Sequence, residues 1–252
     1  MNPAYRDFEF DLPEALLQRL VQVLDDLEPA PLTQLGLEGV PDAQGVYQLF
    51  KDGVLVYVGK TDSEAGLRRR LSRHAQKILH RIGLSPEQVS YKAVRIYVFT
   101  AIDLETQLIR HYAGKGGTAW NNSGFGANDP GRKRDHTRVK SSNFDAIYPI
   151  DIDRPLDVSF ADCTSAAQAL SRAKLAIPYN LRFESGHARR PHEDLLNAPL
   201  SLEDQVFSLR GLLAAVARSL PAGWQATALP GYVLLYKEQD DTYPDGQVLA
   251  RT

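Results

Sequence analysis

Two short runs of β-branched and aromatic residues, separated by an Asp-Gly turn, constrain the fold of this chain more than any other feature. The first run begins with Gly45-Val46-Tyr47 and the second ends with Tyr57-Val58-Gly59, with Lys51-Asp52-Gly53 between them. An Asp-Gly pair between two such runs is typical of a tight turn that joins antiparallel strands. The sequence therefore predicts a β-hairpin over residues 45 to 60.

A basic amphipathic segment follows the hairpin, at residues 66 to 82. Four polar side chains share one predicted face at helical spacing: Arg70, His74, Lys77 and Arg81. Four aliphatic side chains share another: Leu67, Leu71, Ile78 and Ile82. The spacing predicts a helix that buries the aliphatic face and presents a cationic face with one histidine. Such a face is often merely solvated, but two tyrosines at the ends of paired strands beside it favour a functional role.

Charge is distributed unevenly along the chain. The formal net charge is −2, yet residues 60 to 140 hold 16 Lys and Arg and only 7 Asp and Glu, which gives +9. The remainder holds 13 basic and 24 acidic residues, which gives −11. A polyanion would be attracted to the basic block and repelled elsewhere, as expected for a surface that follows a phosphate backbone. Chance clustering of charge is the alternative.

Length and composition bound the class of protein. A chain of 252 residues can form one large core, or one core and a smaller domain. No apolar run is long enough to cross a bilayer, and residues 1 to 11 lack a basic region followed by an apolar segment, so we expect a cytoplasmic protein without membrane association. The single cysteine, Cys163, excludes an intramolecular disulfide and a multi-cysteine zinc site. We expect it to be a small buried apolar residue.

Further elements are predicted on both sides of the hairpin. Asp11 and Glu14 form a capping-box pattern at the start of a helix that runs to about Leu27. Residues 89 to 99 alternate as a strand, which we expect to join the hairpin as a third strand. The other expected elements are a helix from Asp103 to about Gly114, a strand over 146–152, helices over 165–175 and 202–220, the latter capped by Ser201, and a hairpin over 224–237.

The stretch from residue 114 to residue 140 is glycine-rich and basic, and its apolar residues have no period. A loop of this length inside a compact domain is usually functional or disordered. We expect it to contact phosphate or bases, with a mobile solvated loop as the alternative. The basic residues expected to bind DNA there are Arg132, Lys133 and Arg134, and the basic residues of Arg138-Val139-Lys140 follow them in the same stretch.

Taken together, these motifs resemble the GIY-YIG nuclease superfamily. The resemblance rests on the two triplets at this separation, followed by Arg70 and His74 and then by Glu105 and Asn121, and it covers roughly residues 45 to 122. Valine replaces isoleucine in both triplets and keeps the β-branched shape. The stretches 120–126 and 129–132 are similar to the type II restriction endonucleases that cut a GC-rich palindrome such as CCGCGG.

The resemblance implies an α+β fold. Its centre would be a small nuclease core, a three-stranded antiparallel sheet flanked by helices, with an N-terminal helix before it and a C-terminal α/β extension after it. The implied division is an N-terminal helical arm (1–44), a nuclease core (45–152) that includes a DNA-binding loop (114–140), and an accessory region (153–252) for dimerisation or DNA recognition.

The resemblance also implies Mg²⁺-dependent hydrolysis of phosphodiester bonds, with one ion per site held by Glu105 and replaceable by Mn²⁺. A hard divalent ion prefers carboxylate oxygens and retains waters, so one carboxylate suffices when phosphate oxygens complete the shell. The implied catalytic residues are Tyr47, Tyr57, Arg70, His74, Glu105 and Asn121. The cations expected to bind DNA outside the loop are Lys60 and Lys77.

Each implied role has a chemical reason. The planar guanidinium of Arg70 would bind the scissile phosphate. If the motif is aligned one turn or less away, the arginine in this role would instead be Arg68, Arg69 or Arg73. Tyr47 would activate or position the water. Since a free phenol has a pKa near 10, this tyrosine needs help: His74 as proton acceptor, and Lys60 to lower its pKa.

The remaining roles concern position. Tyr57 would place the nucleophile or the phosphate, and Asn121, or the adjacent Asn122, would fix the geometry of the site. Taken singly, each tyrosine could equally be strand packing with an exposed hydroxyl.

The expected partners are double-stranded DNA, a second copy of the chain and a cognate DNA methyltransferase. A palindrome calls for two reading heads related by a two-fold axis, which favours a homodimer. The alternatives are a repair or homing nuclease on the same core, which would usually carry separate DNA-binding domains, and a non-catalytic DNA-binding module.

Overall fold

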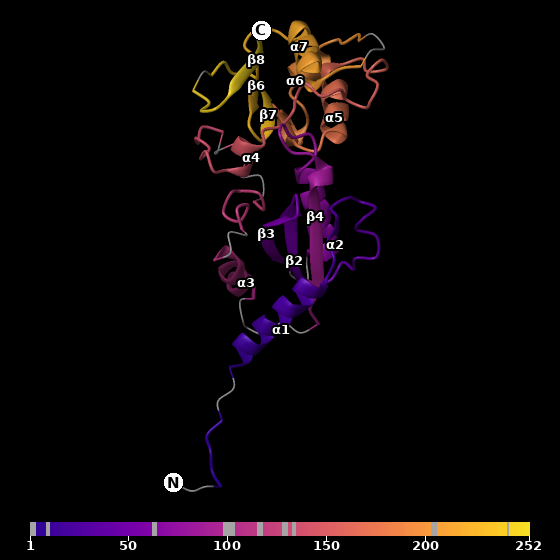
Figure 1. Ribbon diagram of the computed structural model, residues 1–252. Coiled ribbons are helices and arrows are strands. Elements are labelled where there is room, and N and C mark those ends of the chain that lie inside the picture. The colour runs from indigo at the N-terminus through magenta and orange to yellow at the C-terminus, as the bar shows by residue number, and fades with distance from the viewer. Residues whose placement is uncertain are drawn as a thin grey trace. The chain divides into compact units, whose positions relative to one another are not determined.

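The computed structural model describes residues 4–8, 11–61, 65–97, 104–114, 118–127, 131–132, 135–202, 206–240 and 242–252, without the side chains of Leu104 and Arg189. The chain forms two compact units (Figure 1). The first unit comprises Met1–Ala75 and Pro86–Asn121, and the second comprises Gln76–Ser85 and Asn122–Thr252. Each unit has its own four-stranded sheet, so the expected mixed α+β class is confirmed.

This grouping differs from the division expected from the sequence. Residues 122 to 152, expected in the core, belong to the second unit because they bond to its sheet. The fully buried Asp135 accepts hydrogen bonds from Arg182 and Tyr232, and the Ile150 amide donates to the carbonyl of Pro230. No sequence period could reveal these long-range bonds.

The first unit is built from the predicted hairpin and the elements that cover it. Its elements are α1 (Leu12–Asp26), β1 (Ala30–Pro31), β2 (Gly45–Lys51), β3 (Val54–Thr61), α2 (Leu67–Lys77), the 3₁₀ turn η1 (Pro86–Gln88), β4 (Val89–Arg95) and α3 (Leu104–Ala113). The sheet order is β1-β4-β2-β3, and all pairs are antiparallel. The predicted hairpin and third strand are confirmed, but the sheet has a fourth strand, the two-residue β1, which is too short for a periodic signal.

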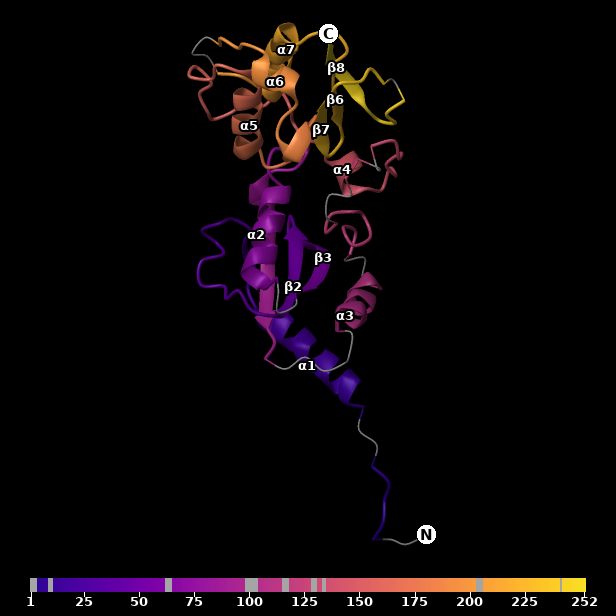
Figure 2. The same ribbon diagram turned by 180° about the vertical axis from the view of Figure 1, so that it is seen from behind.

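Alternation along the hairpin sends side chains to two faces of the first sheet. Val46 and Val58 pack with Leu20 and Leu24 of α1 and with Leu108 of α3. Tyr47 and its neighbours on the other face meet α2. Helix α1 begins as predicted, since the Asp11 side chain accepts a hydrogen bond from the Glu14 amide at 2.9 Å. Figures 1 and 2 both show α3 beside β3, which is an edge strand of the sheet.

Helix α2 is shorter than predicted. It ends at Lys77, and His80 (φ 51°) and Gly83 (φ 77°) then take left-handed backbone conformations that stop a helix. Ile82, expected on the buried face, is 56% exposed. Arg81, expected on a cationic surface, is instead buried. The prediction of a continuous four-residue cationic face is therefore wrong beyond Lys77.

The second unit packs three helices against one face of its sheet. Its elements are α4 (Phe144–Ile147), α5 (Ala166–Ala176), β5 (Asn180–Phe183), the 3₁₀ turn η3 (His187–Arg189), α6 (Glu193–Asn197), α7 (Leu209–Ser219), β6 (Gln225–Leu229), β7 (Tyr232–Tyr236) and β8 (Gln247–Arg251). The sheet order is β5-β7-β6-β8, with β5 parallel to β7 and the other pairs antiparallel. Both views show α5, α6 and α7 together on one side of β6 and β7 (Figure 2). Cys163 is buried there, as predicted.

Two local predictions in this unit are wrong. The strand expected over 146–152 is replaced by the short helix α4, because the Asn143 side chain caps the Asp145 amide at 2.9 Å. The helix expected from residue 202 starts at Leu209, because Ser208 is its cap and accepts from the Gly211 amide at 3.2 Å. The predicted hairpin around Pro230 is confirmed.

Among the described residues, no helix combines the length and the apolar character that spanning a bilayer requires.

Candidate functional site

The two motif tyrosines lie side by side on the face of the first sheet that meets α2. Tyr47 pairs across the hairpin with Gly59, and Tyr57 pairs with Leu49. The ring centroids of the two tyrosines are 6.0 Å apart. Both side chains are buried, with Tyr47 fully inaccessible and Tyr57 7% exposed. The hairpin register therefore brings the tyrosines of the two triplets together.

Close contacts with neighbouring atoms explain why each triplet has a glycine. A Cβ atom on Gly59 would lie 2.4 Å from the Tyr47 hydroxyl, so only glycine leaves room for that ring. A Cβ atom on Gly45 would lie 2.3 Å from the carbonyl oxygen of Val94 and 2.7 Å from a methyl group of Leu67. Gly45 thus allows both β4 and the start of α2 to approach the hairpin closely.

Helix α2 brings a histidine and one arginine to the Tyr47 hydroxyl. The hydroxyl is 2.8 Å from His74 Nε2, and the Arg70 Nε–H group donates to the same oxygen at 3.4 Å. His74 is only 3% exposed, and its ring contacts both tyrosines at centroid distances of 5.5 and 5.3 Å. The alternative arginines, Arg68, Arg69 and Arg73, are exposed.

The electrostatics of Tyr47 follow from this packing. Burial raises the pKa of Tyr47 well above its ordinary value, because the phenolate would be poorly solvated, and the adjacent Tyr57 raises it further. The hydrogen bond and positive charge of Arg70 act in the opposite direction but do not overcome burial. A free phenolate is therefore strongly disfavoured at this position.

Lys60 and Glu105 form a second pair of site residues. The Lys60 ammonium is 3.8 Å from a carboxylate oxygen of Glu105, and the two side chains are 43% and 30% exposed. Lys60 pairs with Val46 across the hairpin, so alternation directs it away from the face that holds Tyr47. The cation against the Tyr47 hydroxyl is therefore Arg70, whereas the sequence suggested Lys60 for that place.

Asn121 clamps the edge of the first sheet. Its side-chain oxygen accepts from the Val58 amide at 2.9 Å, and its side-chain nitrogen donates to the Val58 carbonyl at 2.8 Å. The Trp120 amide also donates to the carbonyl of Val56. The asparagine thus imitates a neighbouring strand at the residue between Tyr57 and Gly59. Asn122, the alternative, has a left-handed backbone (φ 62°) and belongs to the second unit.

The described residues could supply only some of the ligands that a metal ion needs. The described residues contain no group of three His, Cys, Asp or Glu side chains that could enclose an ion. Glu105 is a partly exposed carboxylate beside a cation. Such a group suits Mg²⁺, which is commonly bound by one or two carboxylates while waters and substrate phosphates complete its shell.

Two cations expected to bind DNA, or to lie on the cationic face of the helix, belong to the second unit and pair there with one acidic residue. Lys77 pairs with Asp145 at 2.8 Å. Arg81, whose side chain is 2% exposed, pairs with the same carboxylate at 2.7 Å and donates to the Tyr148 carbonyl. A buried arginine must be paired in this way, because an isolated buried charge is costly. Sequence reasoning missed Asp145, which no local pattern distinguishes from other acidic residues.

The later part of the basic loop is attached to the second unit. The Arg132 guanidinium lies 3.3 Å from Glu184 and 2.8 Å from Glu238. Phe125, prominent between glycines, is buried against Phe144 at a centroid distance of 4.7 Å. Lys133 and Arg134, also expected to bind DNA, lie outside the described residues.

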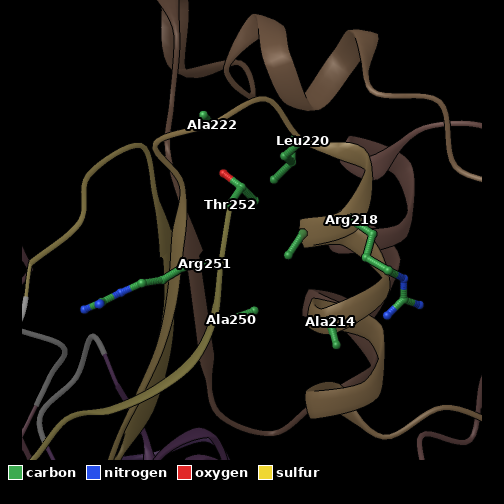
Figure 3. A pocket seen from close by; sticks show the side chains of 8 residues that line it. Ala214, Arg218, Leu220, Ala222, Ala250, Arg251 and Thr252 are labelled. Atoms are coloured by element: carbon green, nitrogen blue, oxygen red, sulfur yellow. The ribbon is translucent and has the colours of Figure 1, made fainter.

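A shallow pocket of about 500 Å³ lies between α7 and β8 in the second unit. It is lined mostly by small apolar side chains, with Arg218 and Arg251 at its margins. Figure 3 shows both guanidinium groups pointing away from its centre, and Arg251 bonds to Gln225 at 2.9 Å. None of the predicted site residues lines it.

The chain matches no protein-family model, and no curated protein has a significantly similar sequence. The assignment of function therefore rests on the motifs and on the geometry described above.

Proposed function

We propose that this protein is a Mg²⁺-dependent, site-specific DNA endonuclease of the GIY-YIG type. It would hydrolyse one phosphodiester bond in each strand of a palindromic, GC-rich site, acting as a homodimer in the cytoplasm alongside a methyltransferase that protects the same site. The observation that carries the proposal is the Tyr47 hydroxyl, which is bonded to both His74 Nε2 and Arg70 Nε. Simple strand packing does not call for a buried phenol between an imidazole and a guanidinium.

The proton chemistry follows from the burial of Tyr47. Since its raised pKa disfavours a free phenolate, Tyr47 acts as a relay. Its O–H proton would pass to His74 Nε2 while the phenol oxygen takes a proton from the attacking water, which requires the fully buried hydroxyl to become accessible when DNA binds. The water oxygen forms a bond to phosphorus, and the bond to the leaving sugar oxygen breaks, with that oxygen taking a proton from solvent. This relay requires neutral His74 with its proton on Nδ1.

The other residues bind and position. Arg70 is half-buried beside Tyr47, where its guanidinium can also reach a phosphate oxygen and offset developing negative charge. Tyr57 packs against both Tyr47 and His74 and keeps their rings in place. Asn121 holds the backbone of β3 between Tyr57 and Gly59. Glu105, which lies beside Lys60, would hold Mg²⁺, and the bound ion would supply Lewis-acid polarisation of the phosphate.

The test is digestion of a mixed-sequence plasmid library by the purified full-length chain with Mg²⁺, followed by mapping of the DNA ends by sequencing. EDTA and Glu105→Ala are the controls. We expect discrete, metal-dependent cuts at one palindrome that disappear in Glu105→Ala. Nicks at many unrelated positions would indicate a repair nuclease instead. Salt-sensitive binding without any cleavage would leave a DNA-binding module.

A further inference from the structure

Within the basic loop, residues 135 to 140 are fixed to the second unit at several points, including both ends of the segment. At one end, the carboxylate of Asp135 is fully buried and accepts from Arg182 and from the Tyr232 hydroxyl, each at 2.8 Å. At the other end, the Val139 amide donates to the side chain of Asp245 at 3.0 Å. This segment is therefore held in place by contacts far away in the sequence.

The charged groups around this segment are mostly neutralised by one another. Arg132 pairs with Glu184 and Glu238, and its guanidinium lies over the Tyr236 ring at 4.2 Å. Arg182 forms an ion pair with Asp135. These pairs stabilise the attachment of the loop and leave their charges little free to attract a distant anion.

Two cations on the fixed segment differ from these. Arg138 and Lys140 flank the clamped Val139, and both side chains are exposed. Across the part of the chain that the structure describes, neither side chain has a hydrogen bond or an ion pair. The nearby acid, Asp245, already accepts from the backbone between them. The segment thus presents two exposed cationic side chains that form no ion pair with the described residues, from a backbone that is already ordered.

We propose that Arg138 and Lys140 form a phosphate-binding surface for the backbone of double-stranded DNA, with Asp135 and Asp245 as the residues that hold it in position. This inference rests on the proposed function, and it assigns the loop contacts to cations other than Arg132. Arginine and lysine both bind phosphate, and neither contact reads sequence. Ordering the segment in advance reduces the entropy lost when DNA binds.

The first experiment measures the affinity of the full-length protein for DNA duplexes in EDTA as a function of salt concentration. The variants are Arg138→Gln, Lys140→Gln and the double substitution. Each lost phosphate contact should make the negative slope of the logarithm of the binding constant against the logarithm of the salt concentration shallower by about 0.9. The change should be the same for every duplex sequence. The matched control is Arg218→Gln on α7, another exposed cation, which should leave the slope unchanged.

The second experiment separates anchoring from charge. Asp245→Asn and Asp245→Gly both remove one negative charge, and both residues tolerate the left-handed backbone at this position (φ 60°). Only asparagine keeps an oxygen that can accept from the Val139 amide. We expect Asp245→Asn to bind at least as tightly as the wild type and Asp245→Gly to bind several-fold more weakly.

The outcomes distinguish the two proposals. Specific cleavage with an unchanged salt slope in the Arg138 and Lys140 variants would overturn this inference and leave the nuclease proposal standing. An equal loss of slope in Arg218→Gln would overturn it too, since the effect would then be one of net charge. Absence of any duplex binding by the wild type would overturn the proposed function itself. Tighter binding of an RNA duplex would contradict the assignment to DNA.

Discussion

At the scale of single residues, the hydroxyl of Tyr47 decides how the candidate site can work. The hydroxyl is fully buried, and it fits beside Gly59 only because glycine has no side chain. Its hydrogen-bond partners are an imidazole nitrogen and a guanidinium. The ring packs as a core residue does, while the oxygen lies within hydrogen-bonding distance of both partners.

Tyr47→Phe should therefore separate packing from chemistry. We expect single-turnover cleavage to fall by about 10²–10⁴-fold, as for loss of a general acid–base group, with DNA affinity within about two-fold of wild type. The free energy of unfolding should fall by roughly 1–3 kcal/mol, because His74 Nε2 loses a buried partner.

The matched control for this variant is Tyr91→Phe. Tyr91 is a buried tyrosine of β4 whose hydroxyl donates to the Gly36 carbonyl at 2.6 Å. Its removal should cost similar stability and leave cleavage intact. Full cleavage activity in Tyr47→Phe would rule out the relay.

At the scale of elements, β3 is the strand on which the site depends. It carries Tyr57, Gly59 and Lys60, yet it is an edge strand of its sheet. An edge strand exposes unpaired backbone groups. The amide of Asn121 satisfies both groups of Val58 and so extends the sheet by one residue.

Asn121→Ala should loosen this edge. We expect faster hydrogen exchange at the Val58 amide and a loss of about 1–3 kcal/mol in the free energy of unfolding, since two backbone groups lose their partners. Amide exchange measured by NMR would check this, with Leu49 in β2 as an internal reference, because β2 pairs with strands on both sides. Unchanged protection of Val58 would show that water replaces the asparagine without cost.

At the scale of the whole molecule, buried phenols in both units link stability to pH. Burial is the main cause that raises the pKa of Tyr47 in the first unit and of Tyr179 in the second. For a raised pKa, the stabilisation is fully present below the ordinary value near 10 and is lost as pH rises through the folded-state value, since the unfolded chain releases its proton first.

We therefore expect the free energy of unfolding to fall as pH rises above about 10, by at most about 1.4 kcal/mol per pH unit for each such phenol. Urea denaturation between pH 8 and pH 11 would measure this slope. Tyr47→Phe and Tyr179→Phe should each make it shallower. A slope that neither substitution changes would mean that other groups control alkaline unfolding.

Much of the local structure could be predicted from the sequence because short-range rules control it. The Asp-Gly turn and strand alternation determine the hairpin and pair Tyr47 with Gly59. The Asp11 cap marks the start of α1. Such features depend on neighbouring residues, and a pattern can report them. Boundaries decided by competing caps, as at Ser208, were predicted less well.

The sequence by itself thus determined the hairpin, the third strand, most helices and the pairing of Tyr47 with Gly59. Only the tertiary structure decided that Arg70, among four neighbouring arginines, meets the Tyr47 hydroxyl, and that Lys60 instead pairs with Glu105. It also decided that the later part of the basic loop attaches to the second sheet through Asp135. The reason is physical: these partners are far apart in the chain, and their pairing depends on packing that local sequence does not encode.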